Sequence, residues 1–428
     1  MTGADVPQDR IAPPPFLADP APAAVLAALP GARAVGGCVR DALAGVAVHD
    51  IDVAAPLPPA EIADRLKAAG LKVFETGLAH GTVTAVLDHQ PVEVTALRRD
   101  LATDGRHAEV AWTTDWRQDA ARRDFTINAM SCDAEGRLWD YFGGRADLAA
   151  GLVRFVGDPE TRLAEDYLRA LRFFRFQARY GQGAPDPAAL AAIRGAVEGL
   201  ARRIAPERIW MELKRLLEAA APSGALDLME ATGIRDAVLP EGACPDLLGA
   251  AIARGLPVDP VLRMAVLVPR AARCDALPGR LRWSREETGQ FRAARDVSLV
   301  PADPAGDDLR RLLADHALPR LLDRCHVAEA WGEVQGGDPG DWPALRARFA
   351  AEPVPVFPLR GQDVLDRGQA PGAAVGRMMM RLRGWWLAGG CRAGRAECLA
   401  ELDRVLAAEA SGPGGGMSGT ADGTTAPD

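Results

Sequence analysis

Residues 36–41 read GGCVRD and residues 49–52 read HDID, and the order of these two segments predicts the fold of the first part of the chain. The apolar run from Ala32 to Val35 is a predicted strand, and Val46 to Ala54 is a second one. A predicted helix near residues 38–44 separates them. Strand, glycine pair, helix and strand with two aspartates, in this order, is far more specific than either short motif alone.

The two aspartates of the second segment are candidate catalytic metal ligands. Side chains alternate between the faces of a strand, so Asp50 and Asp52 are expected to point the same way, with Ile51 buried opposite them. Two carboxylates on one face, about 7 Å apart along the backbone, suit the chelation of two Mg²⁺ ions. Two metal ions that hold the attacking and leaving oxygens are typical of phosphoryl transfer.

Gly36 and Gly37 are candidate phosphate contacts, because they lie between a predicted strand and the start of a predicted helix. Glycine at this place lets backbone N–H groups approach a phosphate, and the helix dipole favours the anion. Arg40 lies in the first helical turn and is expected to reach the same phosphates.

Glu93 is the candidate for a third catalytic carboxylate. It lies in the second half of a predicted hairpin, with strands at residues 82–87 and 92–97. A charge in the core of a strand costs several kcal/mol unless it has a partner, and a metal ion would supply one. The alternative is an edge-strand glutamate that faces solvent.

Residues 122–130 read RRDFTINAM and form a predicted nucleotide-binding segment. Arginine binds phosphate bidentately, and Asp and Asn bond to sugar hydroxyls. The alternative is a helix N-terminus with surface arginines. Upstream, residues 98–107 are predicted to be a loop of the kind that reorients between substrates. Within residues 122–130, the candidate nucleotide-binding residues are Arg122, Arg123, Asp124 and Asn128.

Residues 161–179 are predicted to form one helix, on which Asp166 and Arg169 are adjacent because they are three residues apart. Cytosine and adenine each present an exocyclic amine beside an unprotonated ring nitrogen, which match an Asp acceptor and an Arg donor. Uracil and guanine would leave both protein groups mispaired, at roughly 1–3 kcal/mol each. The pair is therefore predicted to accept C and A, the alternative being a solvated intrahelical salt bridge. Arg172 and Arg175 are expected to hold the triphosphate or stiffen this template.

Composition limits the possible classes of protein. The net charge of −8 argues weakly against a nucleic-acid partner, although it hides local basic patches. Seven scattered cysteines without a CxxC pair favour reduced thiols in the cytoplasm over a zinc site. No apolar run approaches the roughly 20 residues that span a membrane, and we expect no secretory signal.

Over roughly residues 30–220, the chain resembles the bacterial tRNA nucleotidyltransferase/poly(A) polymerase family of class II. The motifs that carry the resemblance are, in this order, GGCVRDALAG, HDID, DGRH, RRDFTINAM, DYFGGRADLAAG and EDYLRALRFFRF. The resemblance implies an α+β fold with a small polymerase-β-like head followed by helices. It also implies an enzyme that adds CMP and AMP from CTP and ATP to the 3′ end of tRNA, with two Mg²⁺ ions on Asp50 and Asp52. The predicted domains are a loose lead-in (1–22), the nucleotidyltransferase head (23–150), a helical neck with the nucleotide template (151–235), a helical body and tail for tRNA (236–410), and a disordered end (411–428).

By the same resemblance, the helix at residues 207–217 braces the template helix. The resemblance also implies a tRNA-binding tail, and the arginines that make it locally basic are Arg377, Arg381, Arg383 and Arg392. Departures from the family pattern are small: Ala54-Ala55 stands where a threonine is frequent. The nucleotide contacts implied by the resemblance are Gly37, Arg40, Arg122 or Arg123, Asp166, Arg169, Arg172 and Arg175.

Several alternatives remain at this point. Poly(A) polymerases tend to carry a basic stretch after the first hairpin, whereas Gly77 to Asp88 contains one His and no Arg. Enzymes that add only part of CCA are another alternative, although Asp104-Gly105-Arg106 supplies the loop element that CC-adding members tend to lack. A non-catalytic tRNA-binding descendant is disfavoured by the aspartate pair, and a small-molecule nucleotidyltransferase by the long helical tail.

Overall fold

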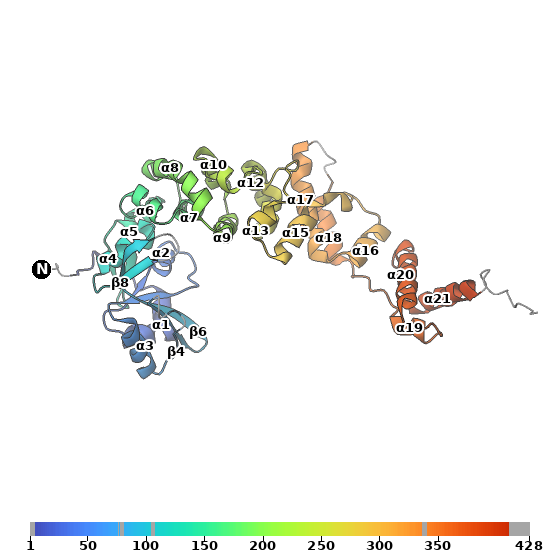
Figure 1. Cartoon of the computed structure of the whole chain (residues 1–428), viewed down its shortest axis with the longest axis horizontal. Coiled ribbons are helices and arrows are strands. Elements are labelled where there is room, and N and C mark those ends of the chain that lie inside the picture. Colours follow the sequence, from blue (N-terminus) through green and yellow to red (C-terminus); the bar gives the residue numbers. More distant parts are fainter. Residues whose placement is uncertain (1–4, 76, 78–80, 104–107, 336–339, 411–428) are drawn as a thin grey trace, which may run out of the picture. The chain divides into compact units, whose positions relative to one another are not determined.

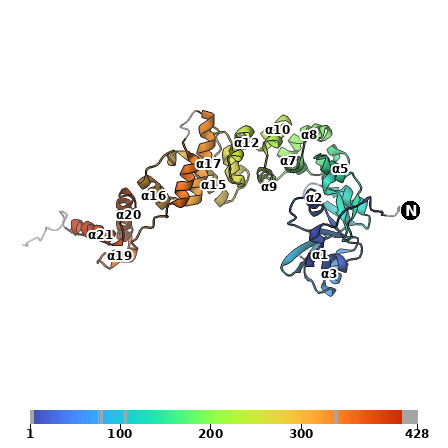
Figure 2. The ribbon, with the colours of Figure 1, turned by 180° about the vertical axis from the view of Figure 1, so that it is seen from behind.

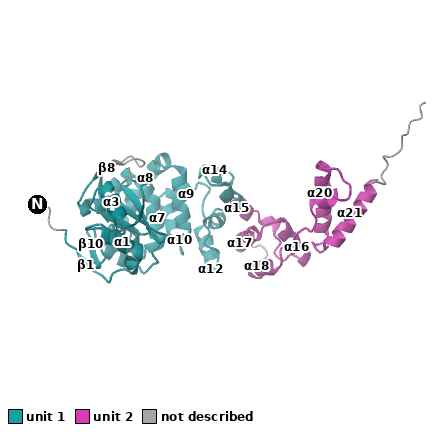
Figure 3. Ribbon diagram, turned by 90° about the horizontal axis from the view of Figure 1, so that it is seen from below, with its two compact units in different colours: residues 1–289 teal, residues 290–428 magenta. Residues whose placement is uncertain are grey.

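The computed structural model of the protein describes residues 5–75, 77, 81–103, 108–335 and 340–410 (Figure 1). The chain divides into two compact units, residues 1–289 and 290–428 (Figure 3). Among the described residues, every strand lies in the first unit, which confirms the α+β class with a helical remainder. The finer predicted boundaries at residues 150 and 235 stay predictions, and the predicted disordered end at 411–428 lies outside the described residues.

The first unit is built on a sheet in which β3 and β6 are parallel and all other neighbours are antiparallel. Its strands, in spatial order, are β1 (Asp9–Arg10), β10 (Arg137–Asp140), β9 (Met130–Cys132), β2 (Arg33–Val35), β3 (Asp52–Ala55), β6 (Gln90–Ala96), β5 (Thr82–Leu87) and β4 (Lys72–Phe74). A separate two-stranded sheet consists of β7 (Arg98–Thr103) and β8 (Ala108–Trp112).

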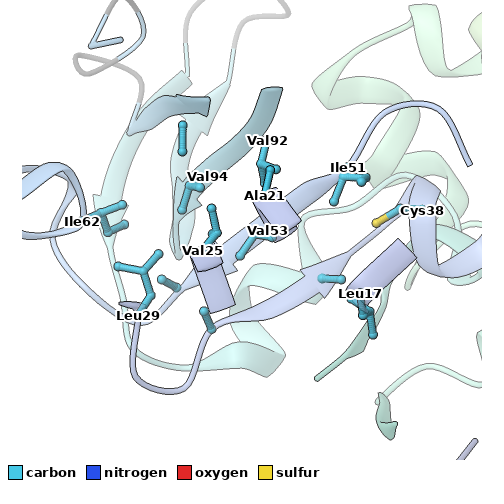
Figure 4. Packing of buried hydrophobic residues seen from close by; sticks show 14 of the residues in the cluster. Leu17, Ala21, Val25, Leu29, Cys38, Ile51, Val53, Ile62, Val92 and Val94 are labelled. Carbon is cyan, nitrogen blue, oxygen red and sulfur yellow. The ribbon is translucent and has the colours of Figure 1, made fainter. Parts of the chain in front are cut away.

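Helices α1 (Pro20–Ala28) and α3 (Pro59–Ala68) pack with the sheet around one hydrophobic core (Figure 4). Val53 of β3 and Val92 and Val94 of β6 are fully buried in this core. Because side chains alternate along a strand, the neighbouring Asp52 and Glu93 lie on the other face. The register pairs these two acidic residues directly, so the alternation of each strand brings two carboxylates together away from the core.

The N-terminal segment, predicted to be a loose lead-in, is part of the fold from Asp9 onward. Asp9–Arg10 pairs with β10, and the 3-10 helix η1 (Pro15–Ala18) buries Phe16 and Leu17 in the core of the head. These two apolar side chains explain the ordering, because their burial removes hydrophobic surface from water.

The predicted hairpin is confirmed as β5 and β6. Its turn is formed by Asp88 and His89, which have φ angles of 49° and 64°. Positive φ at both central residues is the geometry of a type I′ turn, which matches the twist of the flanking strands.

Two predicted boundaries are wrong. The strand expected over Val46–Ala54 begins only at Asp52, because pairing with β6 begins there and residues 46–50 pair with none of the described strands. Of the segment expected as a loop at residues 98–107, the described part, residues 98–103, is strand β7, which pairs with β8 through backbone hydrogen bonds. Asp104-Gly105-Arg106, between the two strands, lies outside the described residues.

The remaining helices of the first unit lie beside the sheet or continue beyond it (Figure 2). They are α2 (Gly37–Leu43), α4 (Trp116–Ala121), η3 (Thr126–Asn128), α5 (Gly144–Ala149), α6 (Pro159–Glu165), α7 (Leu168–Tyr180), α8 (Pro187–Arg203), α9 (Pro206–Leu217), α10 (Ser223–Ala231), α11 (Ile234–Val238), α12 (Pro245–Ala253), α13 (Pro260–Leu267), α14 (Leu277–Arg280) and α15 (Arg285–Arg295), the last of which extends into the second unit.

The single helix predicted over residues 161–179 is broken at Asp166. This residue has φ −153° and ψ 104°, which is extended backbone. Its side chain accepts a hydrogen bond from the Leu168 N–H, and its carbonyl accepts one from the Arg169 N–H. An aspartate that bonds to nearby backbone competes with helix continuation. Asp166 therefore separates α6 from α7.

The second unit contains η4 (Val297–Leu299), α16 (Gly306–Asp315), α17 (Leu318–Gln335), α18 (Trp342–Ala351), α19 (Gly361–Leu365), α20 (Ala373–Ala388) and α21 (Arg395–Ala410). Two hydrophobic clusters stabilise it, one around Phe349 and one around Trp386. Across the described parts of both units, no helix is long and apolar enough to cross a membrane. The seven cysteines, all of them described, are free.

An aromatic cluster joins the head to α7. Phe125 lies 5.0 Å from Phe155 and 5.1 Å from Phe176 between ring centroids, and Phe155 stacks on Phe173 at 6.1 Å. Phe125 is fully buried. The head and α7 therefore share one core.

Phe125→Ala is expected to lower the free energy of unfolding by about 3–5 kcal/mol, because it leaves a cavity at this junction. Urea unfolding of the full chain measures the effect. Phe74→Ala is the matched control, since Phe74 is exposed on β4, and it should change stability by less than about 0.5 kcal/mol. Equal losses in the two variants would contradict the role of Phe125 as a core residue.

Candidate active site

A cleft of about 950 Å³ brings most of the predicted site residues together. It lies between the head residues around α2 and β3 and the helices α7 and α9. The predicted residues that line it are Gly36, Gly37, Arg40, Asp50, Asp52, Arg122, Arg123, Asp124, Asn128, Asp166, Arg169, Arg172 and Arg175. Glu93 is absent from its described lining, although it pairs with Asp52 in the sheet.

The glycine turn at the start of α2 requires Gly36 for two reasons. Gly36 has a φ of 73°, which side-chain-bearing residues rarely adopt. A Cβ at this position would lie 2.7 Å from a guanidinium nitrogen of Arg123. The turn thus allows Arg123 to lie against the backbone at the N-terminus of α2, where an anion is favoured.

The carboxylates gather at the start of β3. Asp50 is not on the strand as predicted but in the segment before it, and it is exposed. Burial raises the pKa of Asp52, Arg123 opposes the shift, and the charges of Glu93 and Asp50 raise it further. Carboxylate oxygens so arranged fit a hard divalent cation, which would relieve their repulsion. In the described part of the chain, no three His, Cys, Asp or Glu side chains form a complete metal cluster.

The predicted nucleotide-binding segment is tied to the neck by ionic hydrogen bonds. The Asp124 carboxylate accepts a hydrogen bond of 2.7 Å from Arg172 Nε and one of 2.9 Å from Asn128 Nδ2. The Asn128 side-chain oxygen accepts a hydrogen bond from Arg40. Burial alone would raise the pKa of Asp124, but Arg172 and Asn128 hold it below its usual value. In this structure Asp124 and Asn128 therefore orient the arginines of the cleft.

Arg122 and Arg123 both lie near Asp119, which is a residue of α4. The distances from their guanidinium nitrogens to the Asp119 carboxylate are 2.8 and 3.5 Å. Burial alone would raise the pKa of Asp119, but the two arginines lower it. One buried carboxylate thus pairs with both arginines, of which Arg123 lies beside the glycine turn.

Asp166 and Arg169 both line the cleft, but not as neighbours on one helix. Asp166 Oδ2 accepts a hydrogen bond of 2.7 Å from Arg208 of α9. Its Oδ1 accepts a hydrogen bond from a backbone N–H at the start of α7. Arg169 forms an ion pair with Glu165 and donates a hydrogen bond of 2.9 Å to the Arg162 carbonyl oxygen. Each group of the predicted template is therefore oriented by a partner of its own.

Arg172 and Arg175 converge on Glu212 of α9, at 3.7 and 3.0 Å. Glu212 is only 5% exposed. Burial lowers the pKa of Arg175 to about 10, against the opposing charge of Glu212. The arrangement holds two guanidinium groups at the cleft wall, as the resemblance implies for a helix that braces the template.

Known proteins resemble this chain along most of its length. Residues 32–154 match the family described as "Poly A polymerase head domain", and residues 184–244 match "Probable RNA and SrmB- binding site of polymerase A". The chain is 35% identical over 385 residues to the mitochondrial CCA tRNA nucleotidyltransferase 1 of Mus musculus, covering 87% of this chain and 86% of the relative. It is 36% identical to the CCA-adding enzyme of Latilactobacillus sakei, covering 81% and 87%.

The chain belongs to the CCA-adding enzyme family. A solved structure agrees: the CCA-adding enzyme of Bacillus stearothermophilus in complex with CTP matches with a TM-score of 0.66 and 26% identity, covering 89% of this chain and 94% of that chain. Members of this family depend generally on divalent metal ions.

Sequence patterns do not reveal several residues of this CCA-adding family member that line the cleft. Arg208 is predicted only as part of a bracing helix, and Asp41 has no predicted role, although Arg40 and Tyr180 both bond to its carboxylate. A usable signal exists for α9: residues 208, 212 and 215 recur at helical spacing and so share one face. Which face meets α7 depends on tertiary contacts.

Glu212→Gln is expected to raise the KM for CTP and ATP about 10-fold, because it removes the buried negative charge that holds both arginines by ion pairing. Steady-state kinetics with each nucleotide measures this change. Glu198→Gln is the matched control, since Glu198 of α8 is an exposed residue paired only with Arg202 among the described contacts. A loss of thermal stability without a change in KM would assign Glu212 to folding alone.

Proposed function

We propose that this chain adds CMP, CMP and AMP from CTP and ATP to the 3′ end of tRNA, without a nucleic-acid template. The observation that carries the proposal is the presence of two carboxylates and a base-reading pair in one cleft: Asp50 and Asp52 on one side, Asp166 and Arg169 on the other. The CCA addition for which the similar proteins are named, and the CTP bound in the B. stearothermophilus structure, support the same assignment.

In this proposal Asp50 and Asp52 would hold two Mg²⁺ ions, and Glu93 would add negative charge beside Asp52. When bound, such ions lower the pKa of the primer hydroxyl and neutralise charge on the triphosphate. The residues of the chain supply the rest. Gly36, Gly37 and Arg123 present donors to the phosphates at the N-terminus of α2.

The base is selected by hydrogen bonds from the neck. The Asp166 carboxylate accepts from the exocyclic amine of C or A, and Arg169 donates to the ring nitrogen. Arg172 and Arg175, oriented by Asp124 and Glu212, hold the nucleotide against α7. Preorganised donors of this kind cost no rearrangement when the substrate binds.

For the tRNA, we propose that the helices after residue 236 bind the acceptor and T arms by shape and backbone contacts. The Thermotoga maritima CCA-adding enzyme, whose structure was solved as a complex with tRNA, has the same fold at a TM-score of 0.55. Of the arginines predicted to make the tail basic, Arg381, Arg383 and Arg392 pair with carboxylates of their own unit. We also propose a cytoplasmic location, which the scattered cysteines without a CxxC pair favour.

The test is incubation of the purified chain with tRNA lacking CCA and each labelled nucleotide. Incorporation of C followed by A is expected. Addition of many A residues would identify a poly(A) polymerase instead, and incorporation of only C or only A would identify a partial enzyme. No incorporation at all, with tRNA still bound, would leave only a tRNA-binding protein.

A further inference from the structure

The cleft carries more positive charge than its proposed reaction with one nucleotide uses. Its described lining contains nine arginines and six carboxylates, and two of those carboxylates are assigned to metal ions. Most of the arginines have a close carboxylate partner. The pairs are Arg40 with Asp41, Arg122 and Arg123 with Asp119, Arg169 with Glu165, Arg172 with Asp124, Arg175 with Glu212 and Arg208 with Asp166.

Arg179 differs from the arginines that precede it on α7. Its side chain is 51% exposed, and its nearest carboxylate oxygen, in Asp41, is 3.9 Å away. The other oxygen of Asp41 already accepts from Arg40 and from the Tyr180 hydroxyl. One carboxylate shared among three donors leaves the Arg179 guanidinium weakly compensated.

Arg215 of α9 is also exposed and lines the same cleft. Within the described residues it has no ion pair or hydrogen bond. Its charge instead acts on Arg175, whose pKa is lowered first by burial and then by Arg172 and Arg215. Arg215 is thus a cation that faces the cleft beside another cation.

The two residues lie at the same end of the cleft, because α7 and α9 run alongside each other (Figure 2). Asp166 pairs with Arg208, and Arg175 forms an ion pair with Glu212, so Arg179 and Arg215 follow about one turn later on each helix. Ten residues separate Arg169 from Arg179, which is about 15 Å along α7. The end with exposed arginines is therefore opposite the base-reading end.

A second cavity of about 440 Å³ adjoins this end. Arg179 and Tyr180 line both cavities, and Arg145 of α5 lines the second one. The cationic surface therefore continues past the cleft along the last turn of α7. Exposed guanidinium groups without strong partners bind phosphate oxygens bidentately.

We propose that Arg179 and Arg215 form a second phosphate-binding site, separate from the contacts to the incoming triphosphate. Its ligand is a phosphate group, either in the backbone of the tRNA 3′ strand or in the pyrophosphate that leaves. The proposal rests on the proposed function, since both sources belong to nucleotide addition to RNA.

The experiment compares the wild type, the double variant Arg179→Ala/Arg215→Ala, the charge-preserving Arg179→Lys/Arg215→Lys, and Arg202→Ala as a surface control on α8. Binding of tRNA lacking CCA is measured without nucleotide at several salt concentrations. Inhibition by inorganic pyrophosphate and the KM for CTP are measured in addition assays. Both target residues are exposed, so the variants should fold, which circular dichroism would check.

The alanine double variant should raise either the Kd for tRNA or the inhibition constant of pyrophosphate about 10-fold. The lysine double variant should give an intermediate value, because it keeps both charges but loses the bidentate geometry. A tRNA effect would also reduce the salt dependence of log Kd by roughly 0.7–0.9 per lost phosphate contact and would assign the site to RNA. A pyrophosphate effect alone would assign it to the leaving group.

The proposal is overturned if both constants are unchanged, if Arg202→Ala has the same effect, or if only the KM for CTP rises. The last result would make the two arginines part of the triphosphate contacts. If the wild-type protein adds no nucleotide, the proposed function is overturned instead. The comparison of tRNA Kd between the wild type and the double variant, measured without nucleotide, would still test the phosphate-binding site.

Discussion

Asp52→Ala should abolish nucleotide addition, with a loss of at least roughly 1,000-fold in rate, while tRNA binding survives. A factor of 1,000 corresponds to about 4 kcal/mol of transition-state stabilisation. The expected size follows from the position of Asp52: it is the first residue of β3, faces Glu93 and lies in the cleft near Asp50. Without it the site loses a carboxylate that would hold the ions for both the attacking and leaving oxygens.

Single-turnover addition to tRNA lacking CCA measures the rate, and a filter-binding assay measures the tRNA Kd. Asp64→Ala is the matched control, because Asp64 is an exposed carboxylate on α3 of the same head. Its rate should equal that of the wild type. Parallel loss of addition and of tRNA binding in Asp52→Ala would show that Asp52 is needed for folding, and would remove the argument for catalysis.

Asp166→Ala should change which nucleotide is added. The ratio of kcat/KM for CTP to that for UTP is expected to fall roughly 10- to 100-fold, because the acceptor for the exocyclic amine is lost and uracil no longer leaves it mispaired. The structure adds a second reason, since Asp166 orients Arg208 and begins α7. The competing nucleotides are best measured in one reaction, with tRNA lacking CCA as primer.

Asp227→Ala serves as control, because Asp227 is exposed on α10 and outside the cleft. It should leave the CTP to UTP ratio unchanged. An equal fall in kcat/KM for both nucleotides in Asp166→Ala would mean that Asp166 supports the cleft without reading the base. Metal-dependent chemistry itself should persist in this variant, which separates it from Asp52→Ala.

The features predicted correctly from sequence depend on local patterns. The hairpin of β5 and β6 follows from alternating side chains, and the glycine turn before α2 follows from residue type and order. The carboxylate pair follows from the same kind of pattern, although Asp50 precedes the strand. Asp50 lies outside the strand because the length of a strand depends on pairing with its neighbour. Strand β3 pairs with β6 only from Asp52 onward.

The features that sequence patterns do not reveal depend on partners far along the chain. Arg208 and Glu212 orient Asp166 and Arg175 across about 40 residues of sequence. The break at Asp166 likewise depends on where its side chain finds donors, and helical periodicity on both sides conceals it. Charged groups whose roles require another helix cannot be assigned from their own helix alone.

The aromatic cluster around Phe125 has a practical consequence for dissecting this protein into fragments. A fragment ending near residue 150 would keep the carboxylates but lose Phe155, Phe173 and Phe176, leaving the Phe125 ring uncovered. Such a fragment would tend to aggregate, because a large apolar surface would meet water. A fragment ending near residue 289, the border of the first unit, keeps this core intact. Any piece that keeps this core therefore also keeps the carboxylates of the head together with Asp166 and Arg169.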